Sequence, residues 1–414
     1  MSTICRKRLG DIINLKRGYD LPSQSRLDGP YPVISSSGIS GYHSEFKVDG
    51  EGLITGRYGT LGEVYYISGK YWPHNTTLYV TDFKSNCPKY VYYLLKCLGN
   101  LKTSDKSAVP GVNRNDLHEI VVPYIQSEQQ ESVAKVLSDL DSKIELSNKI
   151  NAELEAMAKL IYDYWFVQFD FPNAKGKPYK ASGGKMVWSE ELKREIPEGW
   201  SAGVASDIFK FNPTLSVKKG SLSSYIDMNA LPEFGFMTKE IQKKEFNGGM
   251  KFQNGDLAVA RITPCLENGK TGLITLLEED EIGFGSTEFI ILRGKEFDLR
   301  SFASCLSRSE NFRKFAISKM TGTSGRKRVS STDLELFEMP IPTNEILKRF
   351  ELLASPFFKT TTSNVRENQE LSEIRDWLLP MLMNGQVKVG DAERELVMGA
   401  EQEPRYTKKK VKSK

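Results

Sequence analysis

An arginine ends a strand-like run in each half of this 414-residue chain, at Arg57 and at Arg261, and a glycine-containing loop follows each one. Arginine can read guanine through two hydrogen bonds, asparagine can read adenine, and lysines and hydroxyl groups commonly bind phosphates. Two groups of residues are therefore candidates for contacts with a nucleic acid. They are Ser36, Tyr42, His43, Arg57, Tyr58, Lys70, His74, Asn75 and Arg114 in the first half, and Arg261, Asn268, Lys270, Ser286 and Thr287 in the second. Each residue type is also common on ordinary protein surfaces, so the prediction depends on their grouping.

The net charge of the chain is only +4, and its basic residues are unevenly distributed. Without the six basic residues of positions 405–414, 51 basic residues stand against 53 acidic ones, so binding a polyanion requires a local concentration of positive charge. Residues 311–332 supply one, and the corresponding residues 96–114 supply a weaker one. The further candidates from the first of these stretches are Lys319, Arg326, Lys327 and Arg328. A solvated charged surface is the alternative interpretation, and the matching positions in the two halves argue against it.

Catalytic and metal-binding motifs are missing from the sequence. Gly269-Lys270-Thr271 resembles the end of a phosphate-binding loop, but position 264, where that motif needs its first glycine, is a proline. The three histidines and five cysteines have no spacing typical of metal ligands. Glu191-Leu192-Lys193 could be half of a nuclease centre, but no convincing strand upstream supplies a partnering aspartate. The sequence therefore predicts no catalytic residue, no metal site and no cofactor in this chain.

The cellular compartment can be predicted from what the sequence lacks. No run of 18 apolar residues occurs, and the first residues do not form the apolar core of a signal peptide. The scattered, odd-numbered cysteines favour a reducing environment. We therefore expect a soluble, cytoplasmic protein that does not associate with a membrane.

The chain contains an internal repeat. A shift of 217 positions places Asp116-Leu117 on Asp333-Leu334, Pro123 on Pro340 and Asn151 on Asn368, without a gap. A weaker match at a shift of 196 places Asp11-Ile12 on Asp207-Ile208. This period is far longer than the 20–50 residues of a solenoid repeat. A module used twice in one chain suggests that something is recognised twice, at a fixed distance.

Each copy of the repeat begins with a globular part and continues into a long helix. Short β-prone runs broken by Gly, Pro, Asp and Ser predict irregular sheet domains over residues 1–125 and 199–343. Apolar residues at three- and four-residue steps predict amphipathic helices over residues 126–170 and 344–388. Pro356 should kink or restart the second helix, and Pro380 lies near its end.

The two predicted helices need partners, because a long apolar seam is unfavourable in water. We expect them to pair as an antiparallel coiled coil, with residues 171–198 as a loop-rich linker and residues 389–414 as a polar, basic and disordered tail. The alternative is that each helix packs on its own domain. The predicted fold class is α+β: two globular α/β-mixed domains separated by two long paired helices, with an internal pseudo-twofold repeat.

Several motifs resemble those of one family, the specificity subunits of type I restriction–modification systems, over residues 1–390. The first group is Tyr31-Pro-Val-Ile-Ser-Ser-Ser-Gly-Ile-Ser-Gly-Tyr42 with Gly56-Arg-Tyr-Gly-Thr-Leu-Gly62, and the second is Ala260-Arg-Ile-Thr-Pro-Cys-Leu-Glu-Asn-Gly-Lys270 with Gly283-Phe-Gly-Ser-Thr-Glu-Phe289. Each is similar to a class of target recognition domain. Boundary and spacer segments of the family resemble Trp165-Phe-Val-Gln-Phe-Asp-Phe-Pro172, Ile196-Pro-Glu-Gly-Trp200 and Arg375-Asp-Trp-Leu-Leu-Pro380 with Asn384-Gly385.

The resemblance implies a DNA-reading subunit that performs no chemistry. Each target recognition domain would bind half of a split sequence in double-stranded DNA, and the paired helices would set the distance between the halves. Two modification subunits would dock on the helices and supply the S-adenosylmethionine-dependent adenine methyltransferase. Restriction subunits with motor and nuclease activity would join the full complex.

Two other classes of function remain open from the residues alone. The first is a self-contained DNA methyltransferase or nuclease, which a methylation assay on the purified chain would reveal. The second is a coiled-coil scaffold for proteins, without a nucleic acid. Salt-dependent retention on DNA would distinguish this scaffold from a DNA-binding subunit.

Overall fold

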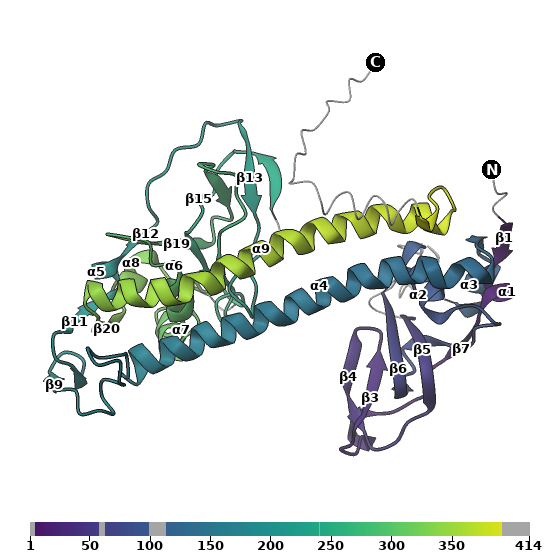
Figure 1. Cartoon of the computed structure of the whole chain (residues 1–414), viewed down its shortest axis with the longest axis horizontal. Coiled ribbons are helices and arrows are strands. Elements are labelled where there is room, and N and C mark those ends of the chain that lie inside the picture. The colour runs from purple at the N-terminus through teal and green to yellow at the C-terminus, as the bar shows by residue number, and fades with distance from the viewer. Residues whose placement is uncertain (1–4, 58–62, 99–112, 240, 324, 391–414) are drawn as a thin grey trace. The chain divides into compact units, whose positions relative to one another are not determined.

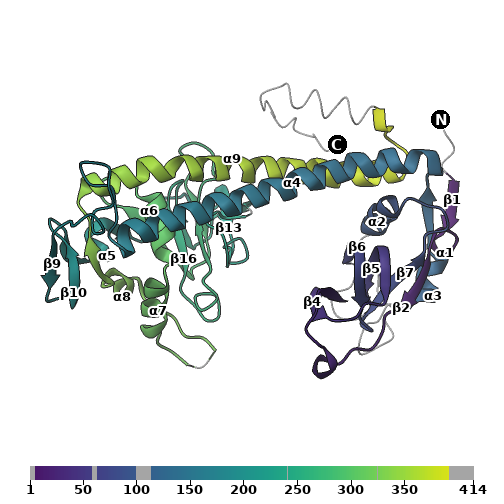
Figure 2. The ribbon, with the colours of Figure 1, turned by 60° about the horizontal axis from the view of Figure 1, so that its bottom comes forward.

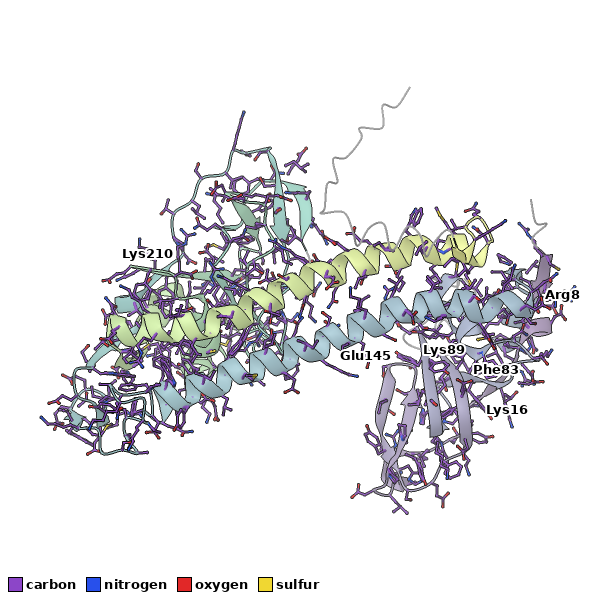
Figure 3. The ribbon with its side chains drawn as sticks, in the orientation of Figure 1. Arg8, Lys16, Phe83, Lys89, Glu145 and Lys210 are labelled. Atoms are coloured by element: carbon purple, nitrogen blue, oxygen red, sulfur yellow. The ribbon has the colours of Figure 1, made fainter. Side chains whose placement is uncertain are left out.

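The computed structural model describes residues 5–57, 63–98, 113–239, 241–323 and 325–390, which divide between two compact units (Figure 1). Unit 1 comprises residues 1–144 and 370–414, and unit 2 comprises residues 145–369. Both boundaries lie inside long helices, and Glu145, the first residue of unit 2, is marked in Figure 3. This division differs from the predicted one, because each helix segment buries apolar residues in the core of its own unit.

Unit 1 is built on a six-stranded sheet with the order β2-β7-β5-β6-β3-β4, in which the β3–β6 pair is parallel and the other pairs are antiparallel. A separate two-stranded sheet joins β1 to β8. The strands are β1 (Cys5–Arg8), β2 (Asn14–Arg17), β3 (Tyr31–Ser35), β4 (Gly38–His43), β5 (Val48–Gly56), β6 (Val64–Pro73), β7 (Thr77–Asp82) and β8 (Val121–Tyr124). The helices are α1 (Leu9–Ile12), α2 (Pro88–Cys97) and α3 (Arg114–Glu119), with a 3-10 turn at Ser23–Ser25.

Unit 2 contains two four-stranded sheets, in the orders β12-β19-β16-β17 and β14-β13-β18-β15, and the two-stranded pairs β9–β10 and β11–β20. The strands are β9 (Met186–Ser189), β10 (Arg194–Pro197), β11 (Ser201–Val204), β12 (Phe209–Phe211), β13 (Leu222–Ile226), β14 (Gln242–Glu245), β15 (Met250–Phe252), β16 (Leu257–Ala260), β17 (Thr271–Leu273), β18 (Gly283–Gly285), β19 (Phe289–Gly294) and β20 (Glu338–Ile341). The short helices are α5 (Ala205–Ile208), α6 (Arg300–Ser307), α7 (Glu310–Ser318) and α8 (Ser331–Glu335).

The repeat predicted from the sequence is present in the backbone. Helices α3 and α8 begin 217 positions apart, and each follows a capping side chain, Asn113 or Ser330, that accepts a backbone hydrogen bond. Strand β1 pairs with β8 so that Cys5 faces Tyr124, and β11 pairs with β20 so that Ser201 faces Ile341. The two shifts found in the sequence, 196 and 217, are therefore the offsets of these paired strands.

The correspondence extends into the main sheets, where the sequence did not reveal it. The order β2-β7-β5-β6 in unit 1 matches β12-β19-β16-β17 in unit 2, and the neighbouring pairs are antiparallel in both. Their central strands, β5 and β16, are almost completely buried over Leu53–Gly56 and Leu257–Ala260. Each unit therefore presents loops on the same four-stranded frame.

The two long helices begin at equivalent positions. Helix α4 (Ser127–Tyr162) starts 217 positions before α9 (Asn344–Met383), and a π-helical turn at Asp163–Val167 follows α4. Both are shorter at their C-terminal ends than predicted from periodicity, which cannot distinguish the last helical turns from an apolar loop. In unit 2 the π-helical turn brings Phe166 against Phe302 of α6 and Phe350 of α9, with ring centres 4.8 and 5.0 Å away.

The helices contact each other within each unit. In unit 2, Asn364 Nδ2 donates to Asn151 Oδ1 at 2.7 Å, and Asn368 Nδ2 donates to Asn148 Oδ1 at 3.0 Å. Residue numbers rise along α9 as they fall along α4, so the helices run antiparallel there. In unit 1, Arg375 Nη1 lies 2.7 Å from Asp141 Oδ1. These contacts confirm the antiparallel direction, whereas the coiled-coil geometry stays a prediction.

The expectation that Pro356 restarts the second helix is wrong. Helix α9 is continuous from Asn344 to Met383 and includes both Pro356 and Pro380. Pro356 removes the hydrogen bond to the carbonyl of Leu352, but both residues lie on the exposed side of the helix, so water can satisfy that carbonyl. Ala354 and Phe358 on the other side are buried and hold the helix in the core of unit 2.

The segment predicted as a loop-rich linker, residues 171–198, is ordered and belongs to unit 2. It contains the β9–β10 hairpin, in which Arg194 faces Ser189. The ring of Phe171 stacks on Tyr179 at 4.7 Å and on Trp200 at 5.4 Å. Its glycines and prolines therefore mark tight turns between packed residues.

Candidate nucleic-acid interface

Arg57 and Arg261 occupy corresponding places on the two frames. The N–H of Arg57 donates to the carbonyl of Thr76 at 2.8 Å, and the N–H of Arg261 donates to the carbonyl of Glu288 at 3.0 Å. Thr76 and Glu288 directly precede the neighbouring strands β7 and β19. The predicted position of each arginine after a strand is confirmed, whereas its contact with DNA stays a prediction.

In unit 2, Glu288 connects Arg261 to the basic stretch. Arg328 donates from Nε to Oε2 of Glu288 at 2.9 Å and from Nη2 to Oε1 at 2.7 Å. The hydrogen bonds from Arg328, with the charges of Arg328 and Arg261, hold the pKa of Glu288 below its usual value against the opposing effect of burial. The buried Nε of Arg261 has no hydrogen-bond partner among the described residues. Arg261 therefore lies close to Glu288, and its Nε–H is a hydrogen-bond donor without a partner among the described residues.

The basic stretch after α7 folds back onto the loop that follows Arg261. Thr321 and Arg328 exchange backbone hydrogen bonds of 2.9 and 2.8 Å, and Thr263 donates to the carbonyl of Lys327 at 3.0 Å. Figure 2 shows this segment extending beyond α7. Lys319, Arg326 and Lys327 are exposed. The structure therefore brings Arg261 together with three of the four basic candidates of this stretch, Arg326, Lys327 and Arg328.

The remaining candidates of unit 2 lie on the same loops but already have partners. Asn268 Nδ2 donates to Glu233 at 3.1 Å, and Lys270 Nζ donates to the carbonyl of Met228 at 3.3 Å. Ser286 Oγ accepts the N–H of Glu288 at 3.1 Å, which stabilises the turn before β19. Thr287 is exposed beside it.

In unit 1, Thr76 gathers three candidates around Arg57. Its Oγ1 accepts the N–H of Ser36 at 3.3 Å and lies 3.1 Å from Nδ1 of His74. Burial, reinforced by the charge of Arg26, lowers the pKa of His74, so its imidazole is neutral at physiological pH. Asn75 follows in the same turn and donates through Nδ2 to Asp20. Ser36, Arg57, His74 and Asn75 therefore form one group.

Other candidates of unit 1 do not belong to this group. Lys70 faces Asp49 at the start of β5, and the eight residue steps from Asp49 to Arg57 correspond to about 26 Å of strand. Tyr42 is exposed on β4, opposite Pro32. Arg114 is exposed at the start of α3, and Tyr58 lies outside the described residues.

The prediction that His43 is available to contact a nucleic acid is wrong. Its side chain is buried, Nδ1 lies 3.1 Å from the N–H of Leu27, and its ring packs edge-on against Trp72 at 5.2 Å. The sequence pattern of a polar residue near other polar residues did not distinguish this core histidine from an exposed one. His43 supports the β3–β4 hairpin and is not presented to solvent.

Sequence reasoning missed the residues that position the loops, including Thr76, Glu288 and Arg308. Arg308 donates to five backbone carbonyls, those of Pro232, Glu233, Gly235, Gly269 and Thr271. Burial lowers its pKa to about 10, although Glu155 acts in the opposite direction. Because its partners are all main-chain atoms, no pattern of side chains could have identified this role.

Two features of the described residues bear on a catalytic or metal centre. No group of three or more His, Cys, Asp or Glu side chains among them could hold a metal ion. Glu191 accepts from Ser189 at the end of β9 at 2.9 Å, and Lys193 pairs with Glu190 at 3.1 Å in the turn between β9 and β10. None of the described helices is long and apolar enough to cross a membrane.

Comparisons with known proteins were consistent over different parts of the chain. A family model described as the type I restriction modification DNA specificity domain matches residues 1–156. The type I restriction enzyme MjaIX specificity subunit of Methanocaldococcus jannaschii is 25% identical over 319 residues, which are 73% of this chain and 69% of that protein. The MjaVIII specificity subunit of the same organism is 22% identical over 414 residues, with 92% of each chain covered. The EcoAI specificity subunit of Escherichia coli is 31% identical over 191 residues, 44% of this chain and 32% of that protein.

A solved structure supports the same fold. The S subunit of the type I restriction–modification system from M. genitalium matches with a TM-score of 0.57 and 16% sequence identity. The match covers 92% of this chain and 97% of that one. The architecture is therefore shared well beyond the residues that the family model matches.

Proposed function

This chain belongs to the family of type I restriction–modification specificity subunits, and we propose that it reads a bipartite sequence in double-stranded DNA with two target recognition domains. The observation that carries the proposal is the repeated frame, in which Arg57 and Arg261 hold the same backbone position. The residue beside each arginine differs, Thr76 in one unit and Glu288 in the other. A shared frame with different side chains suits the recognition of two different half-sites.

The long helices are the proposed spacer between the half-sites. Each of α4 and α9 contributes residues to both units, because the unit boundaries lie after Ile144 and Gln369. The asparagine pairs at Asn148–Asn368 and Asn151–Asn364 fix the register of the two helices in unit 2. A polar pair between two helices is a known means of specifying helix register. The spacer length would then determine the tolerated gap in the DNA target.

Exposed apolar residues on the helices support docking of two modification subunits. Met157 and Leu160 of α4 are 47% and 68% exposed. The residues 217 positions later, Ile374 and Trp377 of α9, are 37% and 48% exposed. Large apolar side chains grouped on a surface commonly mark a protein interface. The repetition of the group on the second helix fits two copies of one partner.

We assign the chemistry of the complex to the partner subunits. In this proposal the chain itself catalyses no reaction, and the modification subunits bind S-adenosylmethionine and methylate adenine. Restriction subunits with motor and nuclease activity complete the assembly. The complex acts in the cytoplasm, where the DNA is accessible.

A methylome comparison tests the proposal. Cells with and without this chain, both containing the modification subunits, should differ in methylation at one bipartite motif. The purified full chain alone should enrich duplexes with that motif from a randomised pool and should transfer no methyl group. Methyl transfer by the chain alone would support a self-contained enzyme, and an absence of salt-dependent DNA binding would support a protein scaffold.

A further inference from the structure

We infer that the outer face of the β14-β13-β18-β15 sheet in unit 2 binds the phosphate backbone of double-stranded DNA beside the second half-site. The inference rests on the proposed function and adds a surface to it, because none of the residues on this face was among the candidates from the sequence. The surface would contribute affinity without reading the base sequence.

Strand register defines the outer face. Ser223 lies opposite Lys244, Tyr225 lies beside Phe284, and Phe284 lies opposite Lys251. Because successive side chains of a strand point to opposite faces, these five residues share one face of the sheet. The alternate residues Ile226 and Phe252 are completely buried in the core of unit 2, which identifies the other face as the inner one.

Aromatic rings hold the two lysines of this face in place. Lys244 Nζ lies 4.0 Å from the centre of the Tyr225 ring, and Lys251 Nζ lies 5.5 Å from the centre of the Phe246 ring. The Phe284 ring contacts both Tyr225 and Phe246, each at 5.1 Å between ring centres. Cation–π contacts orient the ammonium groups before binding, so less side-chain entropy is lost when they contact a phosphate.

Two further lysines lie in a loop that is hydrogen-bonded to the backbone of Phe246. Lys218 and Lys219 are exposed in the loop before β13. Two backbone hydrogen bonds of 2.9 Å join this loop to Phe246: Gly220 N–H donates to the carbonyl of Phe246, and Phe246 N–H donates to the carbonyl of Ser221. None of Lys218, Lys219, Lys244 and Lys251 forms an ion pair with another residue of the described ranges. Their positive charges therefore remain available to an anionic partner.

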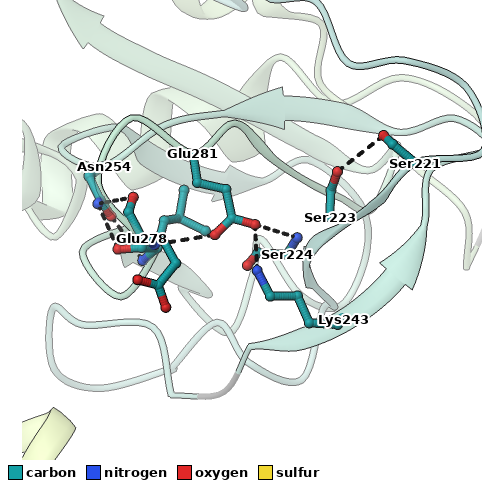
Figure 4. Close-up of polar contacts among 8 residues, drawn as sticks. Ser221, Ser223, Ser224, Lys243, Asn254, Glu278 and Glu281 are labelled. Carbon is teal, nitrogen blue, oxygen red and sulfur yellow. Dashed lines mark hydrogen bonds and ion pairs between the residues drawn. The ribbon is translucent and has the colours of Figure 1, made fainter. Parts of the chain in front are cut away.

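Lys243 provides the contrast within the same strand. It faces Ser224, on the inner side of the register, and its Nζ lies 2.6 Å from Oε1 of Glu281 (Figure 4). The same carboxylate accepts the N–H of Ser224 at 3.0 Å and, through its other oxygen, the N–H of Glu278 at 3.2 Å. Glu281 thus neutralises Lys243 and fastens the acidic loop 278–281 to β13, while Lys244 stays without an acidic partner.

The outer face lies close along the chain to the candidate interface around Arg261. The chain passes from Phe284 on β18 through Ser286 and Thr287 to Glu288. Four residues can span at most about 14 Å, so the lysine-bearing face lies close to the loops proposed to contact bases. A duplex held at Arg261 would bring its flanking phosphates within reach of this face, which favours DNA over an unrelated acidic partner.

The test measures how the affinity of the full chain for a mixed-sequence duplex depends on salt. Replacing Lys244 and Lys251 together by glutamine should reduce the slope of log Kd against log salt by about 2 and weaken binding by about tenfold at low salt. Lys243→Gln changes the charge of the same strand but should leave most of the slope intact. Half-site preference in a randomised duplex pool should stay the same in all variants.

A second double variant tests the same surface without risk to the folding of the sheet. Lys218→Gln with Lys219→Gln removes two charges from a loop without disturbing the ring contacts, and it should also reduce the slope. Unchanged slopes in both double variants, with normal salt-dependent binding by the wild type, would overturn this surface and leave the proposed function standing. A wild-type chain that shows no salt-dependent binding to DNA would overturn both.

Discussion

Arg328 donates three hydrogen bonds to the carboxylate of Glu288, from Nε to Oε1 and Oε2 at 3.0 and 2.9 Å and from Nη2 to Oε1 at 2.7 Å. The pair lies beside Arg261, at the position that Thr76 occupies in unit 1. An acid at the centre of a proposed DNA interface repels phosphates, so its presence needs an explanation. We suggest that Glu288 restrains the basic segment until DNA with the correct sequence replaces it.

Replacing Glu288 by glutamine should therefore strengthen binding to DNA of any sequence and weaken the preference for the correct half-site. The charge of Arg328 would be released, and the repulsion of phosphates by the carboxylate would disappear. Titration of the full chain with target and non-target duplexes measures both affinities. Glu338→Gln removes an exposed acid from β20 in the same unit and should change neither affinity. Equal losses of affinity for both duplexes in Glu288→Gln would contradict the restraining role.

The same pair predicts a pH dependence. The pKa of Glu288 is lower in the folded chain than in the unfolded one, whose ordinary value is 4.5. The ion pair therefore contributes stability above pH 4.5, and this contribution is lost as the pH falls through the folded pKa. Urea denaturation of the wild type and of Glu288→Gln should show a constant difference near neutrality that shrinks in acid. A difference in stability that is independent of pH would mean that the contribution of Glu288 to stability does not come from its charge.

Arg57→Ala and Arg261→Ala should each relax the preference at one half-site. Loss of a bidentate contact with guanine costs about 1–3 kcal/mol of discrimination against the wrong base at that position, and the other half-site should be unaffected. Methylation of target libraries by the assembled complex measures both half-sites together. Lys89→Ala on α2 is a control for Arg57, because Lys89 is exposed and is not among the candidate contacts, and Lys210→Ala on β12 is a control for Arg261. If both arginine variants modify the same sites at the same rate, these arginines do not read DNA.

The sequence revealed the parts of the repeat in which the same residues do the same work. Leu117 and Leu334 are buried in matching helices, and Asp116 and Asp333 occupy the same position in the first turn of those helices, so the shift of 217 could be detected in the sequence. The central sheets escaped notice because only burial is shared there: Leu53 and Leu257 match, but most of their neighbours differ.

The candidate site was predicted less completely than the fold. The position of an arginine after each central strand followed from the pattern of the strand, whereas Lys70 and His43 needed the sheet register to be placed. The hydrogen bonds of Arg308 and of the arginine backbones end on carbonyl groups, which every residue carries. Such contacts leave no signal in one sequence, because they depend on how the chain folds and not on the identity of the accepting residue.

The asparagine pair of the long helices gives a prediction about stability. Asn151 and Asn364 join α4 to α9, and Asn151 is buried. Asn151→Leu should cost about 1–3 kcal/mol, because the amide of Asn364 loses its acceptor. The double variant with Asn364→Leu should recover much of this loss, while the register of the helices becomes less strictly defined. Urea denaturation of the two single variants and the double variant measures the coupling, and additive losses would show that the two side chains do not interact.

Glu351 of α9 predicts a second, opposite pH dependence. Burial raises its pKa to about 7, although it accepts the N–H groups of Ser301 at 3.2 Å and Phe302 at 2.8 Å. A raised folded pKa means that stability is fully present below pH 4.5 and declines as the pH rises through 7. Glu351→Gln keeps an acceptor for α6 and avoids the buried charge, so it should gain up to about 3 kcal/mol relative to the wild type above pH 7. Identical pH profiles of stability for the wild type and Glu351→Gln would show that the Glu351 carboxyl does not cause the decline.

The spacer role of the helices predicts the effect of lengthening both of them. Four residues inserted near Asn148 in α4, with four more near Asn368 in α9, add about 6 Å to each helix. Since one base pair rises about 3.4 Å, the gap between the half-sites should lengthen by about two base pairs. The same insertion in α4 alone shifts the partners of Asn148 and Asn151 and should reduce activity at every gap length. Methylation of targets with systematically varied gaps measures the outcome, and an unchanged optimum in the doubly lengthened chain would remove the helices as the determinant of spacing.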